Sequence, residues 1–184
     1  MAVLCCVDLN DIPSFCGGVN APGLNRQLRI ACGEDVVSID AAVGHKITTK
    51  ITVRPAVVAV AANPSATPPV VAVAAVPAGK FYTWNFAKED QEFSSERDEN
   101  GLWKTAVKIF IPKMEAAKSD VLNNSTGDDK ITVVQDRNGR WRLIGSDTEG
   151  CTIKVKEQTN PKNGYVVEIM WESSHSPYFY EGGF

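Results

Sequence analysis

The sequence predicts a mainly β protein, an antiparallel β-sandwich or barrel with one short α-helix packed on it. Apolar and polar residues alternate in several short runs between residues 45 and 171, the pattern of strands with one buried face. Asn-Gly pairs begin at Asn100, Asn138 and Asn163, and such pairs favour tight hairpins. Helical spacing follows only Pro112. We therefore expect roughly eight to ten strands, mostly joined as hairpins, in a single domain over residues 1–184.

The N-terminal third is expected to hold short elements. Prolines and glycines break residues 1–26 into an irregular N-terminal arm. Short strands are expected over 27–31 and 35–39. A longer, half-buried strand is predicted over 45–53, where apolar and polar side chains alternate until Pro55 ends the strand.

An uncharged, valine-rich segment follows this strand. The hexapeptide Val-Val-Ala-Val-Ala-Ala occurs at 57–62 and again at 70–75, separated by a connector with three prolines. Exposed strands of this composition pair edge to edge, so a protein that stays dissolved has to cover them. We interpret residues 55–79 as an inserted arm, either a disordered spacer or strands covered by a neighbouring chain. The second interpretation predicts contacts between subunits at Val57, Val58, Val60, Val70, Val71 and Val73.

Residues 80–111 are expected to form a long hairpin around an acidic turn. Alternation in the return strand places Trp103, Val107 and Ile109 on one face. Residues 88–99 carry six acidic and two basic side chains. Such carboxylates can supply an acid/base pair or a cation site, but mixed charge is also typical of a solvated hairpin tip.

The helix is predicted over 114–123, with Pro112 in its first turn. Its apolar residues recur at helical spacing: Met114, Ala117, Val121 and Leu122. One apolar stripe on a short helix indicates that the helix lies across a sheet.

The remaining C-terminal part is predicted to be β. Strands over 130–135 and 140–144 flank an Asn-Gly turn, and another strand begins at Cys151. In the last strand a set of alternate side chains shares one face: Tyr165, Val167, Ile169 and Trp171. The aromatic tail after Glu172 shows no pattern.

Composition and cysteine usage restrict the functional class. A net charge of −3 disfavours binding to nucleic acid through phosphate neutralisation. The sequence has no apolar run long enough to span a membrane and no secretory signal. Five cysteines, an odd number, favour a reduced protein that folds in a cytoplasm.

No catalytic, cofactor-binding or metal site is predicted, and we expect no enzymatic activity. His45 and His175 are far apart in the sequence and lie outside any known motif, so both are interpreted as surface residues. Cys16 precedes two glycines, but the sequence places no base beside it, and a buried thiol is the favoured interpretation. The spacing of Cys5, Cys6, Cys16 and Cys32 is irregular for zinc.

Several segments together match a known family pattern. A strand over 103–112 leads directly into the helix, a hairpin with Asn138-Gly139 follows, and the last strand opens with Asn163-Gly164-Tyr165. This order resembles tail-tube-like structural proteins of tailed bacteriophages and prophages, particularly the short ones of Bacteroidetes hosts. Cys16-Gly17-Gly18 and the segment after it resemble their N-termini. The resemblance covers residues 14–54 and 80–180, and the valine-rich repeat departs from it as an insertion.

The resemblance implies a virion subunit that closes into a ring, a hexamer or larger, and contacts adjacent rings. Phage DNA would pass through without specific binding, in a tail tube, tail terminator, neck, tail-barrel ring or other head–tail connector. Assembly would take place in the cytoplasm of the host bacterium, without a membrane or a cofactor. Acidic side chains could line the lumen and repel the DNA backbone: Glu89, Asp90, Glu92, Glu96, Asp98 and Glu99.

The alternative interpretation is a β-sandwich module that binds carbohydrate or acts as an adhesin. Aromatic side chains could form platforms for sugars: Trp84, Trp103, Trp141, Trp171, Tyr178 and Tyr180. Three of the four tryptophans lie on the apolar face of an alternating strand, which favours the core instead.

Overall fold

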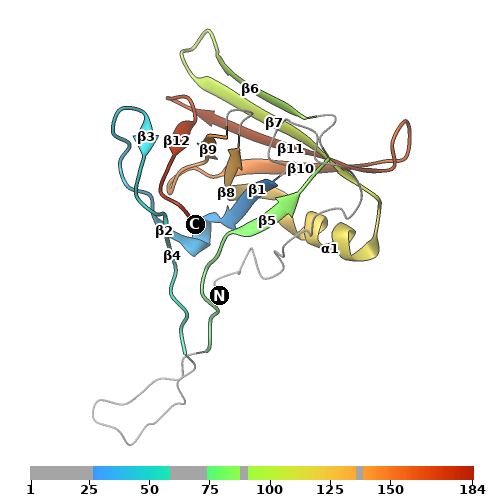
Figure 1. The fold of residues 1–184 in the computed structure, drawn as a ribbon, viewed down its shortest axis with the longest axis horizontal. Helices are drawn as coiled ribbons and strands as arrows, with labels where there is room; N and C mark the ends of the chain where they lie inside the picture. Colours follow the sequence, from blue (N-terminus) through green and yellow to red (C-terminus); the bar gives the residue numbers. More distant parts are fainter. Residues whose placement is uncertain (1–26, 59–73, 88–90, 136–138) are drawn as a thin grey trace, which may run out of the picture.

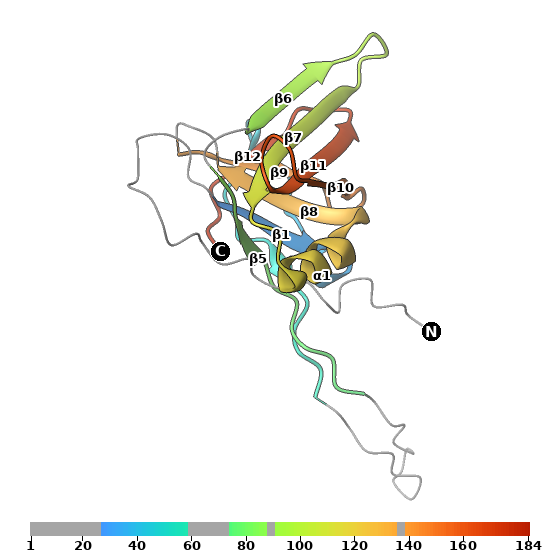
Figure 2. The ribbon, with the colours of Figure 1, turned by 90° about the vertical axis from the view of Figure 1, so that its right-hand side faces the viewer.

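The computed structural model describes residues 27–58, 74–87, 91–135 and 139–184. Within these residues the chain is mainly β, with one α-helix packed against a large, curved, mixed sheet, as the sequence predicts (Figures 1 and 2). The elements are β1 (Gln27–Cys32), β2 (Val36–Ser38), β3 (Lys46–Ile47), β4 (Thr52–Val53), β5 (Tyr82–Asn85), β6 (Glu92–Arg97), β7 (Trp103–Pro112), α1 (Ala116–Ser125), β8 (Gly127–Gln135), β9 (Trp141–Ile144), β10 (Cys151–Gln158), β11 (Gly164–Ser173) and β12 (Tyr178–Tyr180).

Ten of the described strands form the large sheet, in the order β3-β12-β9-β8-β10-β11-β7-β6, with β1 beside β8 and β5 beside β1. The strands β2 and β4 form a separate two-stranded sheet. All pairings in the large sheet are antiparallel except that of β3 with β12. The hairpins expected around Asn138-Gly139 and Asn163-Gly164 are therefore confirmed as the pairs β8–β9 and β10–β11.

Two hydrophobic clusters lie on opposite faces of β1, β8 and β9. The larger cluster joins these strands to β5, β7, β10, β11 and α1, and includes Leu28, Trp84 and Leu122, all with no exposed surface. The smaller cluster contains Ile131 and lies between the other face of the strands and the segment that holds β2, β3 and β4. Successive side chains of a strand point to opposite faces, so β8 is buried on both. This double burial places β8 at the centre of the fold.

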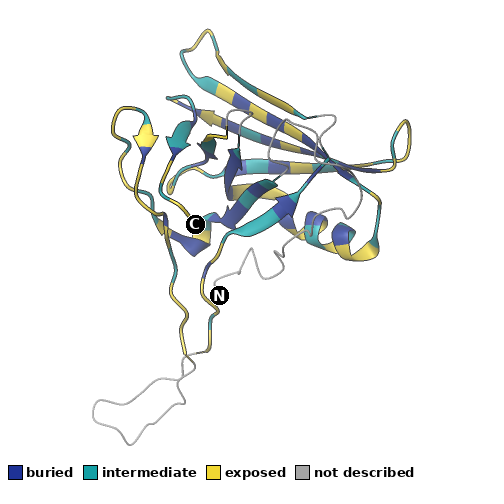
Figure 3. Cartoon of the chain, in the orientation of Figure 1, coloured by how far each residue is buried: buried dark blue, intermediate teal, exposed yellow. Residues whose placement is uncertain are grey.

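The strands β7 and β11 form the longest regular pairing among the described residues, from Gly164 opposite Pro112 to Ser173 opposite Trp103. Buried and exposed residues alternate along both strands (Figure 3). The shared buried face predicted for the last strand is confirmed, because each of its members is at most 5% exposed: Tyr165, Val167, Ile169 and Trp171.

The hairpin expected over 80–111 is shorter than predicted. The strands β6 and β7 pair from Glu92 opposite Lys108 to Arg97 opposite Trp103. By contrast, β5 pairs with β1, with Leu28 opposite Trp84. The alternation over residues 81–86 is compatible with either partner. Packing decides between them, since Trp84 is completely buried in the larger cluster together with residues of β1.

The strand predicted over 45–53 is interrupted. Its two ends form β3 and β4, which pair with β12 and β2 respectively, and the residues between them are not in a strand. Both Ile47 and Ile51 nevertheless reach the smaller cluster. The alternation therefore predicted the burial of Ile47 and Ile51 correctly, although no continuous strand connects them.

The helix begins two residues later than expected, and Pro112 is the last residue of β7 instead of a first-turn residue. Lys113 follows with a φ of 67°, a left-handed conformation that turns the chain out of the strand. Of the predicted apolar stripe, Leu122 is buried, Met114 and Val121 pack against the core, and Ala117 is exposed.

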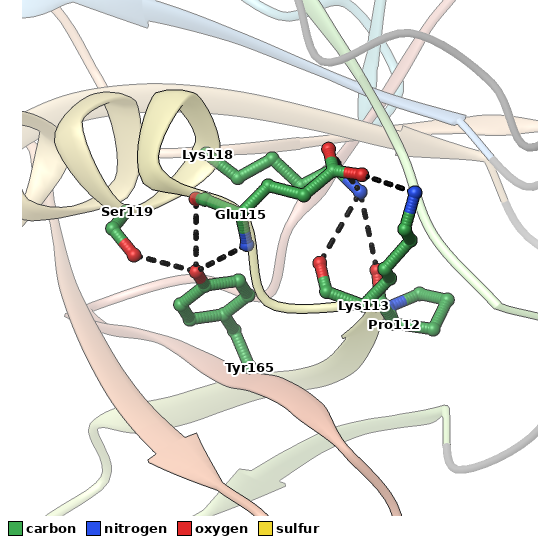
Figure 4. A network of polar contacts seen from close by, with 6 residues as sticks. All are labelled: Pro112, Lys113, Glu115, Lys118, Ser119 and Tyr165. Carbon is green, nitrogen blue, oxygen red and sulfur yellow. Dashed lines mark hydrogen bonds and ion pairs between the residues drawn. The ribbon is translucent and has the colours of Figure 1, made fainter.

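Tyr165 of β11 positions the start of the helix (Figure 4). Its hydroxyl lies 2.6 Å from Ser119 Oγ and accepts a hydrogen bond of 3.2 Å from the backbone N–H of Glu115. The ammonium of Lys118 donates to the carbonyls of Pro112 and Lys113, and it forms an ion pair with Glu115 at 3.3 Å. One side chain of the sheet thus satisfies polar groups at the helix N-terminus, which would otherwise lack partners.

Two further features differ from the sequence predictions. The aromatic tail contains β12, a three-residue strand that is too short to show alternation. Cys32 is disulfide-bonded, whereas the cysteine count predicted reduced thiols.

Candidate interaction surfaces

The described part of the valine-rich insertion is an extension of two adjacent segments that leaves the body of the molecule. The segments 54–58 and 74–80 run side by side away from the sheet in both views (Figures 1 and 2). Val57 and Val76 form an antiparallel bridge with two backbone hydrogen bonds, of 2.8 and 2.9 Å. The Val57 side chain is 38% exposed and that of Val58 is 79% exposed. The other predicted contact residues lie outside the described residues: Val60, Val70, Val71 and Val73.

Three residues fix the root of this extension. The backbone N–H of Arg54 donates to the carbonyl of Asp35 at 2.7 Å, and its carbonyl accepts from Gly79 N–H at 2.8 Å. The guanidinium of Arg54 also forms an ion pair of 2.6 Å with the Asp35 carboxylate, which is mostly buried. A Cβ at Gly79 would lie 2.7 Å from the Asp35 carbonyl oxygen, so only glycine allows this approach. The two segments therefore leave the body from a fixed point.

The predicted acidic residues do not form a uniformly acidic surface within the described residues. Glu92 and Glu96 are exposed on β6, but Lys108 and Lys104 stand directly opposite them on β7. Glu99 is exposed in the turn, and Glu89 and Asp90 lie outside the described residues. The lysines offset much of the negative potential that the sequence predicted for this hairpin.

The tip of the β6–β7 hairpin is held by Asp98. Its carboxylate accepts hydrogen bonds of 2.9 Å from the backbone N–H groups of Asn100 and Leu102, and its other oxygen lies 3.2 Å from Lys104 Nζ. Desolvation acts to raise the pKa of Asp98. The N–H donors and the Lys104 ammonium outweigh this effect, so the pKa is lowered from its ordinary value. In turn, Asp98 raises the pKa of Lys104.

The structure brings together the two histidines, although they are far apart in the sequence. His175 stacks on Tyr178 with ring centroids 4.2 Å apart, and His45 approaches the same tyrosine at 5.0 Å. Ser176 Oγ lies 2.9 Å from His45 Nε2. Among the described residues no carboxylate contacts either imidazole, so a Ser-His-Asp arrangement is not assembled in that part of the chain.

Most of the aromatic residues considered for sugar binding are buried or packed against other side chains. Trp84, Trp171 and Tyr180 are at most 5% exposed, so their rings are not available for stacking with a ligand. Trp141 packs against Phe184 at 5.1 Å, and Tyr178 lies between the two histidines. Trp103 is half-buried on β7. The described residues thus offer no row of exposed aromatic rings.

Reactive and metal-binding groups are equally sparse in the described part of the chain. Burial raises the pKa of the Cys151 thiol to about 12, which disfavours the nucleophilic thiolate. Within that part, no group of three or more His, Cys, Asp or Glu side chains is placed to hold a metal ion. Cys16, Cys5 and Cys6 lie outside it. No described helix is sufficiently long and apolar to cross a membrane.

Comparison with known proteins adds no assignment. No family model matches the chain, and neither the curated proteins nor the solved structures include a significant match to it. The function is therefore inferred from the sequence and from the geometry of these surfaces.

Proposed function

We propose that this protein is a virion structural subunit that assembles with copies of itself through the arm of residues 55–79. The assembly is a ring of a phage tail tube, neck, tail barrel or other head–tail connector, through which DNA passes without specific binding. Its partners are further copies in the same ring and the adjacent virion rings. No catalytic step is assigned to it.

The single observation that carries this proposal is the base of the arm. Val57 and Val76 form a β-bridge, and Val57 and Val58 expose apolar surface to solvent away from the body of the molecule. Each square ångström of apolar surface that a partner covers contributes roughly 25 cal/mol. An uncharged extension whose two segments are hydrogen-bonded to each other is suited to cover by a neighbouring chain.

The fixed root favours a directed arm over a loose spacer. Arg54, Asp35 and Gly79 hold both segments against the body, so the arm leaves in a defined direction. A preorganised binding element loses less conformational entropy when it binds than a flexible linker does. This supports docking on a specific neighbour.

The charge pattern is compatible with passage of DNA. Lysines on β7 face glutamates on β6, so the described hairpin has no basic stripe that would hold a phosphate backbone. The virion location and the ring are inferred from the resemblance of the sequence to tail-tube-like proteins.

A pair of matched substitutions tests the arm. Val58→Asp places a charge on the arm at a side chain that is 79% exposed, and Val43→Asp does the same at a side chain that is 81% exposed but lies outside the arm. Neither change should affect folding of the isolated chain, because both sites are solvated. We expect Val58→Asp to disperse the assembly and Val43→Asp to leave it intact, as measured by light scattering and negative-stain electron microscopy.

The outcomes separate the two candidate functions. Rings or tubes of the unmodified chain that Val58→Asp disperses would support the proposal. A monomer at every concentration, or assemblies equally affected by both substitutions, would contradict the role of the arm. Binding of that monomer to a glycan array would then support the sugar-binding alternative.

A further inference from the structure

One face of the large sheet carries an ordered pattern of charge. The strands β6, β7, β11 and β10 are neighbours in that order, and residues that stand opposite each other point to the same face. On the face away from the larger hydrophobic cluster, eight exposed side chains are charged, seven of which lie in two rows: Glu92, Glu96, Lys104, Lys108, Lys154, Glu168 and Glu172, with Lys156 beyond the rows. We call this surface the charged face.

The register arranges the charged face in two rows of alternating sign that run across the strands. The first row is Glu92, Lys108, Glu168 and Lys154, one residue on each of the four strands. The second row is Glu96, Lys104 and Glu172. Within the first row, Lys108 Nζ lies 3.5 Å from a carboxylate oxygen of Glu168.

Between the two rows lies an uncharged row that centres on a small and a large side chain. Ala106 of β7 stands opposite Met170 of β11, with Ser94 and Thr152 at the ends. An apolar centre with a charged rim is the usual arrangement of a protein–protein interface.

We propose that the charged face binds the same face of a second copy of this chain, related by a two-fold axis that runs along the strands between β7 and β11. Rotation about this axis places β6 over β10 of the second copy and β7 over β11. Each row then faces the same row of the second copy. Glu92 then meets Lys154 of the second copy, Lys108 meets Glu168, and Lys104 meets Glu172. The central row places Ala106 over Met170 of the second copy, so a small side chain faces a large one.

The even number of strands makes the first row self-complementary. A row with the signs minus, plus, minus, plus becomes plus, minus, plus, minus when it is reversed, so each position meets its opposite. An interface of this isologous type closes as a dimer. It uses a surface separate from the arm and does not depend on the proposed function.

A charge swap tests this contact. In a single copy Glu92 and Lys154 are three strand spacings apart, about 14 Å, too far for a direct ion pair. Lys154→Glu and Glu92→Lys should each raise the dimer dissociation constant by about tenfold. The double variant should restore it, because the exchanged charges meet only across the interface.

The experiment uses the full chain and sedimentation velocity at about 0.05 M and about 0.5 M NaCl, since salt screens exposed charges. Lys50→Glu is the matched control, because Lys50 is exposed and lies between β3 and β4, away from the four strands of the charged face. Glu99→Lys, in the exposed hairpin turn, is the control for Glu92→Lys.

Weaker dimerisation of both single variants, rescue in the double variant and unchanged controls would support the proposed contact. An unmodified chain with no salt-sensitive dimer would overturn it. So would a double variant that is as weak as the single ones. Assembly through the arm would not respond to Lys154→Glu, so the two contacts are distinguishable.

Discussion

The strand β8 and the base of the arm have similar residues in opposite surroundings. Val133 in β8 has no exposed surface, whereas Val58 in the arm is 79% exposed. The difference comes from their neighbours. Three strands of the same chain flank or pair with β8, namely β1, β9 and β10, but the described arm pairs only with itself through Val57 and Val76. Valine favours a strand in both places, and the surrounding chain decides whether that strand is covered.

The same substitution at both places tests this difference in burial. Val133→Ala should lower the free energy of unfolding by about 2–3 kcal/mol, because it leaves a cavity in the smaller cluster. Val58→Ala should change it by less than about 0.5 kcal/mol in the isolated chain. Urea denaturation followed by tryptophan fluorescence measures both. Equal losses would mean that the body of the protein buries the arm.

A second substitution tests whether the arm is fixed to the body. Gly79→Ala adds a Cβ that would lie 2.8 Å from the Asp35 Cβ, closer than such contacts normally occur. We expect a loss of about 2 kcal/mol through overpacking and faster hydrogen exchange of the Val57 and Val76 amides. Ala78→Ser, at an exposed neighbouring position, is the control. Unchanged exchange in Gly79→Ala would show that the root does not orient the arm.

A smaller effect on stability is expected at the contact between α1 and the sheet. Tyr165→Phe removes the hydroxyl that contacts Ser119 and the backbone of Glu115. The loss of these hydrogen bonds should cost about 1 kcal/mol, measured by thermal or urea unfolding. Tyr178→Phe, whose ring contacts involve the two histidines, is the control. An equal loss in both variants would argue against a specific role for the Tyr165 hydroxyl.

The smallest effect on stability is expected at the tip of the β6–β7 hairpin, where the Asp98 carboxylate contacts two backbone N–H groups and Lys104. Because the folded-state pKa of Asp98 is below its ordinary value of 3.8, its contribution to stability is present above that pH. That contribution is lost as the pH falls through the lowered value. We expect the amide resonances of Asn100 and Leu102 to shift and to exchange faster in this acidic range.

Lys104→Gln is the partner experiment for the hairpin tip. Without the ammonium, the pKa of Asp98 should rise, so the same amide changes should begin at a higher pH. An identical pH profile in both proteins would mean that the backbone donors alone hold the carboxylate.

The alternation of apolar and polar residues, together with the turn residues, was sufficient to predict most strands of the sheet. The pairs β8–β9 and β10–β11, and the common buried face of Tyr165 and Trp171, follow from spacing that is local in the sequence. Pairing between distant segments was not predictable in this way. The alternation around Trp84 does not specify β1 as the partner of β5, and the aromatic tail is too short to identify β12.

For the candidate surfaces, too, some features were predictable from the sequence and others appear only in the tertiary structure. The sequence alone identified the arm by its uncharged valine repeat and the β6–β7 turn by its acidic residues. It did not reveal that Asp35 and Arg54 hold the arm root, that the two histidines meet at Tyr178, or that lysines face the acidic residues. Each of these contacts joins residues through strand register or packing, which an isolated sequence segment does not contain.

The sequence by itself thus determined the β class, most strand positions and the unusual character of residues 55–79, because side-chain polarity and backbone preference act over a few neighbouring residues. The tertiary structure alone decided which strands pair, where the apolar strands are covered and which charges stand side by side. These depend on burial shared by distant segments, and that burial is defined only when the whole sheet has formed.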